Sequence, residues 1–312
     1  MTLIQLDYII AVDNYRHFAK AADACFVTQP TLSMQIQKLE DQLGVTIFDR
    51  SKHPVVPTDI GVKIIAQARI VANESSRINE IIAEEKDEVT GDLTIGVIPT
   101  LSPYLLPLFI NDFITKYPKV QLTIQEMVTE EVLQKMNNDL LDVGIIVTPS
   151  GDSNFKELPI FYEEFMGYVS PRHTLSSKSE LSIQDVGYED LWLLNEGHCF
   201  RNQVLNICHP DPLQEKNKKF KYESGSLEAL KRIVDQHGGM TLLPELATLD
   251  FDTKAKQKLR PFVDPKPIRE VSLVIKRSFV KRKLVQALHE IILSSIPTHL
   301  NSKKNGEVIK WK

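Results

Sequence analysis

The spacing of apolar residues along the chain changes character near residue 90. Before it, apolar positions recur at the three- and four-residue spacing of amphipathic helices, whereas after it short apolar runs alternate with helical segments. The run GDLTIGVIP, which begins at Gly91, is the first with the character of a buried strand. The pattern therefore predicts a helical N-terminal part and a separate α/β part, with a boundary near Gly91.

Three helices are predicted at the start of the chain. The first two would bury Leu6, Ile9, Ile10 and Val12, and then Phe18, Ala21, Ala22 and Cys25. After a break at Phe26 and Val27, Thr28 can cap a third helix that tolerates Pro30 in its first turn and ends at Gly44. Its buried stripe would be Leu32, Ile36, Leu39 and Leu43. Two short helices across a tight break form a helix-turn-helix.

The outer face of the third helix is polar. Neutral donors and acceptors suit base edges and a cation suits a phosphate, and this face would carry Gln29, Thr31, Ser33, Gln35 and Lys38. The segment VTIFDRSKHPVVPTDIG follows, and it could form a hairpin wing that presents Arg50, Lys52 and His53 to a DNA backbone. A helical surface that is polar without binding anything explains the same residues.

Composition bears on nucleic-acid binding, on location and on disulfide content. The chain has 312 residues, 42% of them hydrophobic, and a net charge of −4, so charge alone does not indicate nucleic acid. We expect a cytosolic protein, because the start resembles no signal peptide and no apolar run of transmembrane length occurs. Three cysteines are too few for a disulfide framework there.

The second part of the chain reads as an open α/β sheet. Helical spacers such as LLPLFINDFITKY and GSLEALKRIVDQ separate the predicted strands DLTIGVIP, VQLTIQEM, VGIIV, EFMGYVS, LWLLN, MTLLP and EVSLVIK. Ligands of such sheets bind beyond the carboxyl ends of strands, where Thr100 and Thr129 fall. Each threonine could equally be a helix N-cap. From Lys276 onward we expect a solvated basic helix and a frayed tail over residues 301–312.

The segment GHCFRNQVLNICH, residues 197–209, holds two of the three cysteines. Gly197 provides a turn, and Cys199 would begin a short helix next to His198 and Arg201. We expect the helix N-terminus and these two side chains to lower the pKa of Cys199. The pair Cys199 and Cys208 can be two buried small side chains, part of a zinc site with His198 and His209, or a reversible disulfide.

Distance constrains the disulfide alternative. Nine steps of about 1.5 Å along a helix separate the two Cα atoms by ~13 Å, whereas a disulfide requires less than ~7 Å. The bond could therefore form only if the helix unwinds, so oxidation would be a conformational switch.

Residues 17–50, HFAKAADACFVTQPTLSMQIQKLEDQLGVTIFDR, resemble the winged helix-turn-helix of LysR-type transcriptional regulators, and PTDIGVKIIAQARIVANESSRINEIIAEEK resembles their linker helix. The resemblance implies DNA contacts from Thr28, Gln29, Pro30, Thr31, Ser33, Gln35, Lys38 and Arg50. Met34 and Gln37 stand where relatives often have arginine. The linker helix would pair two chains, and its apolar residues Ile64, Ala68, Val71 and Ala72 either supply that face or pack on their own domain.

The resemblance implies the following organisation. An N-terminal all-α winged helix-turn-helix (residues 1–60) and a linker or dimerisation helix (58–88) precede a two-lobed α/β regulatory domain (91–300) like that of periplasmic binding proteins. Lobe I would comprise about 91–163 and 268–300, and lobe II about 164–267.

The segment GHCFRNQVLNIC resembles, more narrowly, the redox segment of the peroxide-sensing LysR-type regulators. By this resemblance Cys199 is the peroxidatic thiol and Cys208 the resolving one, and the peroxide pocket contains Thr100, Thr129 and His198, with Asp142 and Arg269 matching less directly. It implies a transcription regulator rather than an enzyme, with no cofactor, metal or membrane. Its partners would be promoter DNA, hydrogen peroxide, RNA polymerase and further copies in a homodimer or homotetramer. There are two alternatives to a peroxide sensor: a LysR-type regulator that binds a small organic effector in the cleft between the lobes, and a thiol peroxidase.

Overall fold

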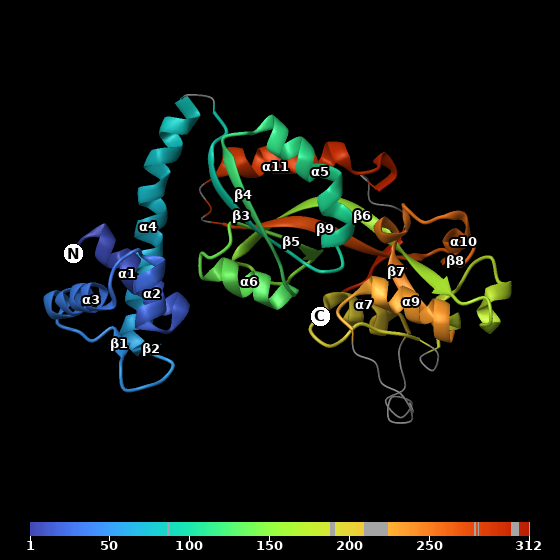
Figure 1. Cartoon of the computed structure of the whole chain (residues 1–312), viewed down its shortest axis with the longest axis horizontal. Coiled ribbons are helices and arrows are strands. Elements are labelled where there is room, and N and C mark those ends of the chain that lie inside the picture. Colours follow the sequence, from blue (N-terminus) through green and yellow to red (C-terminus); the bar gives the residue numbers. More distant parts are fainter. Residues whose placement is uncertain are drawn as a thin grey trace. The chain divides into compact units, whose positions relative to one another are not determined.

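The computed structural model describes residues 1–85, 88–187, 191–208, 224–277, 279, 281–300 and 306–311 (Figure 1). It divides into two compact units, one built mainly on residues 1–88 and the other on residues 89–277 and 284–312. Among the helices of these described ranges, none is long and apolar enough to cross a membrane.

The first unit is the predicted helix-turn-helix with a wing. Its helices are α1 (Leu3–Tyr15), α2 (Phe18–Ala24), α3 (Gln29–Leu43) and α4 (Asp59–Glu85), and the antiparallel strands β1 (Phe48–Asp49) and β2 (Val56–Pro57) form the wing. Thr28 caps α3 by accepting a hydrogen bond from the Thr31 amide, and Gly44 ends it with φ 70° in the left-handed region. The predicted stripe of α3 is buried except for Leu43, which lies in the last turn and is exposed.

The second unit is built on one mixed sheet. Its strands are β3 (Gly91–Val97), β4 (Val120–Glu126), β5 (Val143–Thr148), β6 (Phe155–Val169), β7 (Met240–Pro244), β8 (Leu259–Pro261), β9 (Lys266–Lys276) and β10 (Gly306–Val308). They run in the order β4-β3-β5-β9-β6-β7, and β8 pairs with β6 and β10 with β9. The predicted strand LWLLN is wrong as a strand, because Leu191 and Leu194 make only isolated bridges.

Helices cover this sheet. They are α5 (Ser102–Lys116), α6 (Thr129–Asn137), α7 (Cys199–Cys208), α9 (Leu227–His237), α10 (Thr253–Lys256) and α11 (Arg282–Ser295). Figure 1 shows α5 and α11 along one face of the β3–β5 part of the sheet and α6 against the other. Gly144 allows α6 to approach closely, since a Cβ there would lie 2.8 Å from Val132 Cγ1. This approach fixes the position of Thr129, the first residue of α6.

Strand β6 connects two parts of the second unit. Through Glu164 it pairs with β9, and from Phe165 onward it pairs with β7 instead. Beyond this change of partner, an apolar core gathers residues from strands, from α7 and α9 and from the C-terminal end; it includes Phe165, Phe200, Val204, Ile207, Leu230, Leu242 and Ile309. Helix α7, which carries Cys199 and Cys208, is thus packed on the part of β6 that pairs with β7.

The C-terminal end is ordered over residues 306–311. Strand β10 pairs in parallel with Lys266–Ile268 of β9, and Ile309 and Trp311 are buried. The predicted frayed tail is therefore wrong for these six residues, which have two apolar side chains to bury and a free strand edge to join. The rest of the predicted tail, residues 301–305 and 312, lies outside the described part of the chain.

Candidate redox site and nucleic-acid interface

The two cysteines of the second unit lie at opposite ends of α7. Gly197, with φ 92°, turns the chain just before this ten-residue helix, as the sequence predicts. Both cysteines are free thiols. The helical rise places their Cα atoms ~13 Å apart, so no disulfide can form while α7 is intact.

The Cys199 thiol is buried and surrounded by groups with opposing effects. Burial raises the pKa of Cys199, while the Thr129 hydroxyl, the Arg269 charge and the backbone amides of Cys199 and Phe200 oppose that rise. Burial is the larger effect. The expectation of a lowered pKa is therefore wrong, because a sequence shows a helix N-terminus but not how deeply the sulfur is buried.

The Thr129 side chain faces this thiol with an unused hydroxyl. Its Oγ1 is buried and makes no hydrogen bond of normal geometry to any described residue, although it lies near enough to the sulfur to lower the pKa of Cys199. A buried hydroxyl without a partner costs about 1–3 kcal/mol. The Thr129 hydroxyl can therefore donate a hydrogen bond to a molecule that binds next to the Cys199 sulfur.

His198 and Arg201 do not supply the positive charge expected of them. Burial lowers the pKa of His198, with Glu126 opposing, so the imidazole is neutral near pH 7. Arg201 Nη1 donates to the Leu194 carbonyl oxygen at 3.1 Å, so this guanidinium fastens the segment before α7. His198 nevertheless directly precedes the thiol and is buried there.

Arg269 supplies the positive charge of the site. Its fully buried side chain donates through Nη1 to Thr100 Oγ1 at 3.0 Å and through Nη2 to the Thr100 carbonyl oxygen at 3.2 Å. Its guanidinium lies over the Phe200 ring, 5.2 Å from the ring centroid. The structure therefore brings Thr100 and Arg269 together beside the start of α7.

Glu163 is the member of this network that the sequence analysis missed. It is the cross-strand partner of Arg269 and accepts a hydrogen bond from Arg269 Nε at 2.8 Å, while its second oxygen accepts from the Leu246 amide at 2.8 Å. Burial raises the pKa of Glu163 above its ordinary value, and the Arg269 charge opposes the rise. The available signal was weak: Glu163 directly precedes the predicted strand EFMGYVS, and Arg269 directly precedes the predicted strand EVSLVIK.

Neither threonine caps a helix. The N-cap of α5 is Leu101 and that of α6 is Val128, and neither helix has a side-chain cap hydrogen bond. The capping explanation is therefore wrong for Thr100 and Thr129. The Thr100 hydroxyl accepts from Arg269, and the Thr129 hydroxyl has no hydrogen-bond partner among the described residues.

Asp142 does not lie in this pocket. Asp142 directly precedes β5, and its carboxylate accepts a hydrogen bond at 2.9 Å from the amide of Thr94, the middle residue of β3. Thr100 lies six positions later in the chain, beyond the carboxyl end of β3. At about 3.3 Å per residue, the Asp142 carboxylate is therefore well separated from Thr100.

The C-terminal segment is bonded along α7. Three side-chain amides of the helix donate to its carbonyl oxygens: Asn202 to Trp311 at 3.2 Å, Gln203 to Ile309 at 2.7 Å and Asn206 to Lys310 at 2.8 Å. The Trp311 indole in turn donates to the Pro149 carbonyl oxygen at 3.1 Å. Residues 306–311, here called the C-terminal strap, thus hold α7 from outside. No local pattern in the sequence predicts this contact.

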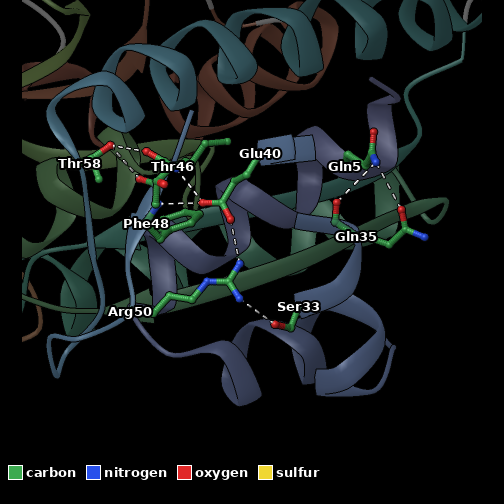
Figure 2. A network of polar contacts seen from close by, with 9 residues as sticks. Gln5, Ser33, Gln35, Glu40, Thr46, Phe48, Arg50 and Thr58 are labelled. Atoms are coloured by element: carbon green, nitrogen blue, oxygen red, sulfur yellow. Dashed lines mark hydrogen bonds and ion pairs between the residues drawn. The ribbon is translucent and has the colours of Figure 1, made fainter. Parts of the chain in front are cut away.

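In the first unit, several predicted DNA contacts are already engaged by neighbours (Figure 2). Gln5 Nε2 donates to Gln35 Oε1 at 3.3 Å, and Arg50 donates to Ser33 Oγ at 3.2 Å and to Glu40 at 2.9 Å. Glu40 also accepts from the amides of Ile47 and Phe48, which anchors the wing to α3. Gln35, Ser33 and Arg50 therefore stabilise the fold of the first unit through hydrogen bonds within it.

Other residues of the predicted interface stay exposed. Thr28 and Thr31 share a hydrogen bond between their hydroxyls at 2.8 Å, whereas Gln29, Pro30 and Lys38 are exposed. Cys25 is the C-cap of α2 and packs partly buried against the core, as predicted for a small residue at the turn.

The predicted apolar face of α4 belongs to its own unit. Ala68 is buried in the core and Ile64 and Val71 pack against it, so this face is not free to pair chains. Exposed apolar residues lie elsewhere on the helix, including Ile70, Ile78 and Ile81.

The zinc alternative lies partly outside the described residues. His209 and the basic segment after it, through residue 223, are not described. Among the remaining residues, no group of three or more potential metal ligands is gathered in one place.

Both units match one protein family. Residues 3–62 match the bacterial regulatory helix-turn-helix of the lysR family, and residues 86–296 match the LysR substrate binding domain. The hydrogen peroxide-inducible genes activator of Haemophilus influenzae is 33% identical over 97% of this chain and its own full length.

Solved structures give the same result. A full-length OxyR variant from Pseudomonas aeruginosa matches with a TM-score of 0.78 and 34% identity, over 95% of this chain and 99% of that one. An OxyR mutant from Corynebacterium glutamicum with hydrogen peroxide bound matches with a TM-score of 0.62 and 25% identity, over 98% of each chain.

Proposed function

The chain belongs to the LysR family of bacterial transcription regulators, and we propose that it senses hydrogen peroxide through a reversible Cys199–Cys208 disulfide. One observation carries this proposal: a buried thiol lies beside the unpaired Thr129 hydroxyl and a buried arginine. The similarity to OxyR proteins, one of them solved with hydrogen peroxide, supports the same ligand.

The first step is oxidation of Cys199. Its thiolate attacks one peroxide oxygen and forms an S–O bond as the O–O bond breaks, which yields a sulfenic acid and hydroxide. A hydroxyl donor next to the sulfur can orient the peroxide and stabilise the departing oxygen. We assign this role to Thr129, with Thr100 and His198 completing the pocket. Arg269 favours the thiolate over the thiol.

The second step is closure of the disulfide. Cys208 attacks the Cys199 sulfenic acid, and the S–S bond forms as water leaves. Burial raises the pKa of Cys208 to about 12, so this thiol is unreactive until α7 opens. Opening α7 also breaks the three hydrogen bonds from its amides to the C-terminal strap. Oxidation of one buried sulfur would thereby release the C-terminal strap.

The regulator acts on promoter DNA as an assembly. We propose that the exposed isoleucines Ile70, Ile78 and Ile81 of α4 pair two chains, because apolar side chains exposed on a long helix gain most from a second copy. Two lobes, divided near Glu164 where β6 changes partner, would transmit the rearrangement. We further propose that the chains form a homotetramer that contacts RNA polymerase. We also propose a cytosolic location, where reductants reset the disulfide.

Peptide mass spectrometry of the full chain after stoichiometric peroxide tests the proposal. Wild type should form the Cys199–Cys208 disulfide, Cys208→Ser should stop at a sulfenic acid that dimedone traps, and Cys199→Ser should remain reduced. Cys25→Ser is the matched control and should behave as wild type. Promoter binding of the oxidised and reduced protein should differ in the wild type and in Cys25→Ser, but not in Cys208→Ser or Cys199→Ser. A disulfide that forms with no change in DNA binding would contradict sensing, and repeated turnover of peroxide would indicate a thiol peroxidase instead.

A further inference from the structure

Two large apolar side chains are exposed at the DNA-binding edge of the first unit. Phe26, in the turn between α2 and α3, is 97% exposed, and Met34, on α3, is 62% exposed. Pro30 lies between them in sequence, is also exposed, and shares a face of α3 with Met34 four residues later. Phe26, Pro30 and Met34 are called the apolar edge below.

The fold gains nothing from Phe26. Its φ of 55° lies in the left-handed region, which costs a residue with a Cβ about 1–2 kcal/mol and which glycine or asparagine adopts more readily. Its ring buries almost no surface, and the turn itself is closed by backbone bonds, from the Phe26 amide to the Asp23 carbonyl oxygen and from the Val27 amide to that of Ala22. A strained and exposed phenylalanine therefore points to a contact outside the chain.

The polar residues around this edge are less free than the sequence suggests. Three of them already have side-chain hydrogen-bond partners within the unit: Thr31 bonds to Thr28, Ser33 to Arg50 and Gln35 to Gln5. Over residues 29–38 of α3 the exposed residues are Gln29, Pro30, Met34, Gln37 and Lys38. The surface available to a base edge thus combines two apolar side chains with two glutamines and one cation.

We infer that Phe26 and Met34 read thymine in the major groove by contact with its C5-methyl group. The N-terminal half of a recognition helix faces the base edges, and the thymine methyl is the apolar group that the major groove presents. Lys38 is exposed four residues beyond Met34 and suits a phosphate. The inference rests on DNA binding by the first unit and does not depend on the redox switch.

The test is a comparison of thymine with deoxyuridine, which lacks only the methyl group. A duplex is first selected from a random pool with the full-length reduced protein, and each thymine is then replaced in turn. Wild type should lose affinity by about fourfold at one or two positions of each half-site, which is the free energy of burying one methyl-sized group. Other positions should be unaffected.

Variants assign each methyl group to a side chain. Met34→Ala and Phe26→Asn should each bind the thymine duplex more weakly and should lose the thymine preference at its own position. Phe26→Asn should melt at the same or a higher temperature than wild type, because asparagine tolerates the left-handed region, so weaker binding could not be ascribed to unfolding. Lys38→Ala is the matched control and should weaken both duplexes equally with a reduced salt dependence.

Equal affinity of the wild type for every thymine and deoxyuridine duplex would overturn the inference. Retention of the thymine preference by both Phe26→Asn and Met34→Ala would overturn it as well. Because all binding is measured on reduced protein, neither result bears on the peroxide proposal.

Discussion

The two helices on which the proposed function depends, α3 and α7, are held in different ways. Signals within or next to α3 specify it, since Thr28 caps it, Gly44 ends it and a regular apolar stripe packs it. In contrast, α7 packs its apolar residues in the core and is also held by amide bonds to the C-terminal strap, one of them spanning 106 positions. A helix that adjacent residues specify does not depend on a distant segment for its stability. A helix that a distant segment holds can be opened by a change at its ends.

The largest expected effect concerns the pH dependence of Cys199 oxidation. Because burial raises the pKa of this thiol, its thiolate fraction should increase about tenfold for each pH unit through neutrality. The second-order rate constant for the first step should therefore rise about a hundredfold between pH 6 and pH 8. Stopped-flow oxidation of Cys208→Ser, in which the first step is isolated, measures this. A rate that is flat over the same interval would show a lowered pKa and refute the assignment.

The next largest effect separates the Thr129 hydroxyl from the fold. Thr129→Val removes a buried hydroxyl that has no hydrogen-bond partner among the described residues, so folding stability should be unchanged or higher. Oxidation of Cys199 should nevertheless slow by tenfold or more, which corresponds to at least about 1.4 kcal/mol of barrier. Thr129→Ser keeps the hydroxyl and serves as the control, with a rate near that of wild type. Equal rates for the valine and serine variants would remove Thr129 from the chemistry.

A smaller effect tests the C-terminal strap. Replacing both Asn202 and Asn206 with Ala removes two of its hydrogen bonds, which are worth together about 1 kcal/mol at partly exposed positions. Closure of the disulfide from the sulfenic acid should therefore quicken about fivefold, with formation of the sulfenic acid unchanged. Asn111→Ala, at an exposed asparagine of α5, is the matched control. Slower or unchanged closure in the double variant would show that the strap does not restrain α7.

The smallest effect on redox chemistry is expected in the other helix. Thr28→Ala removes the N-cap of α3 and should lower the stability of the first unit by about 1 kcal/mol. Thermal unfolding of the full chain measures this loss, and Thr28→Ser should retain the cap. Neither substitution should alter the rates of oxidation or disulfide closure. A change in those rates would mean that the two helices are energetically coupled in the reduced protein.

The same contrast explains what the sequence could predict. The bounds of α3, its cap and the wing follow from residues within a few positions of one another, and they are confirmed. The ends of α7 also follow from local signals, Gly197 before it and its own apolar spacing. What holds α7 could not be predicted, because the bonds to Ile309, Lys310 and Trp311 depend on a chain path that no local pattern encodes.

The redox site shows the limit in electrostatic terms. The sequence predicted that Cys199 begins a helix and that Thr100 and Thr129 follow strands, as the structure has them, and the family resemblance suggested Arg269 for the same pocket. It failed on the direction of the Cys199 pKa, because burial depth is a property of the assembled core rather than of flanking residues. It missed Glu163 for a related reason, since the pairing of Glu163 with Arg269 requires the register of β6 on β9. The family resemblance also suggested Asp142 for the pocket, whereas its carboxylate binds the Thr94 amide of β3.

Hydrogen exchange on matched reduced and oxidised samples of the full chain tests the central claim most directly. Formation of the Cys199–Cys208 disulfide should increase exchange across residues 199–208 and, at the same time, across the strap at residues 306–311, because opening α7 breaks the bonds between them. Residues 29–43 of α3 should exchange at the same rate in both samples. If the disulfide forms while residues 199–208 and 306–311 keep their protection, α7 does not open and the switch proposed for this regulator is wrong.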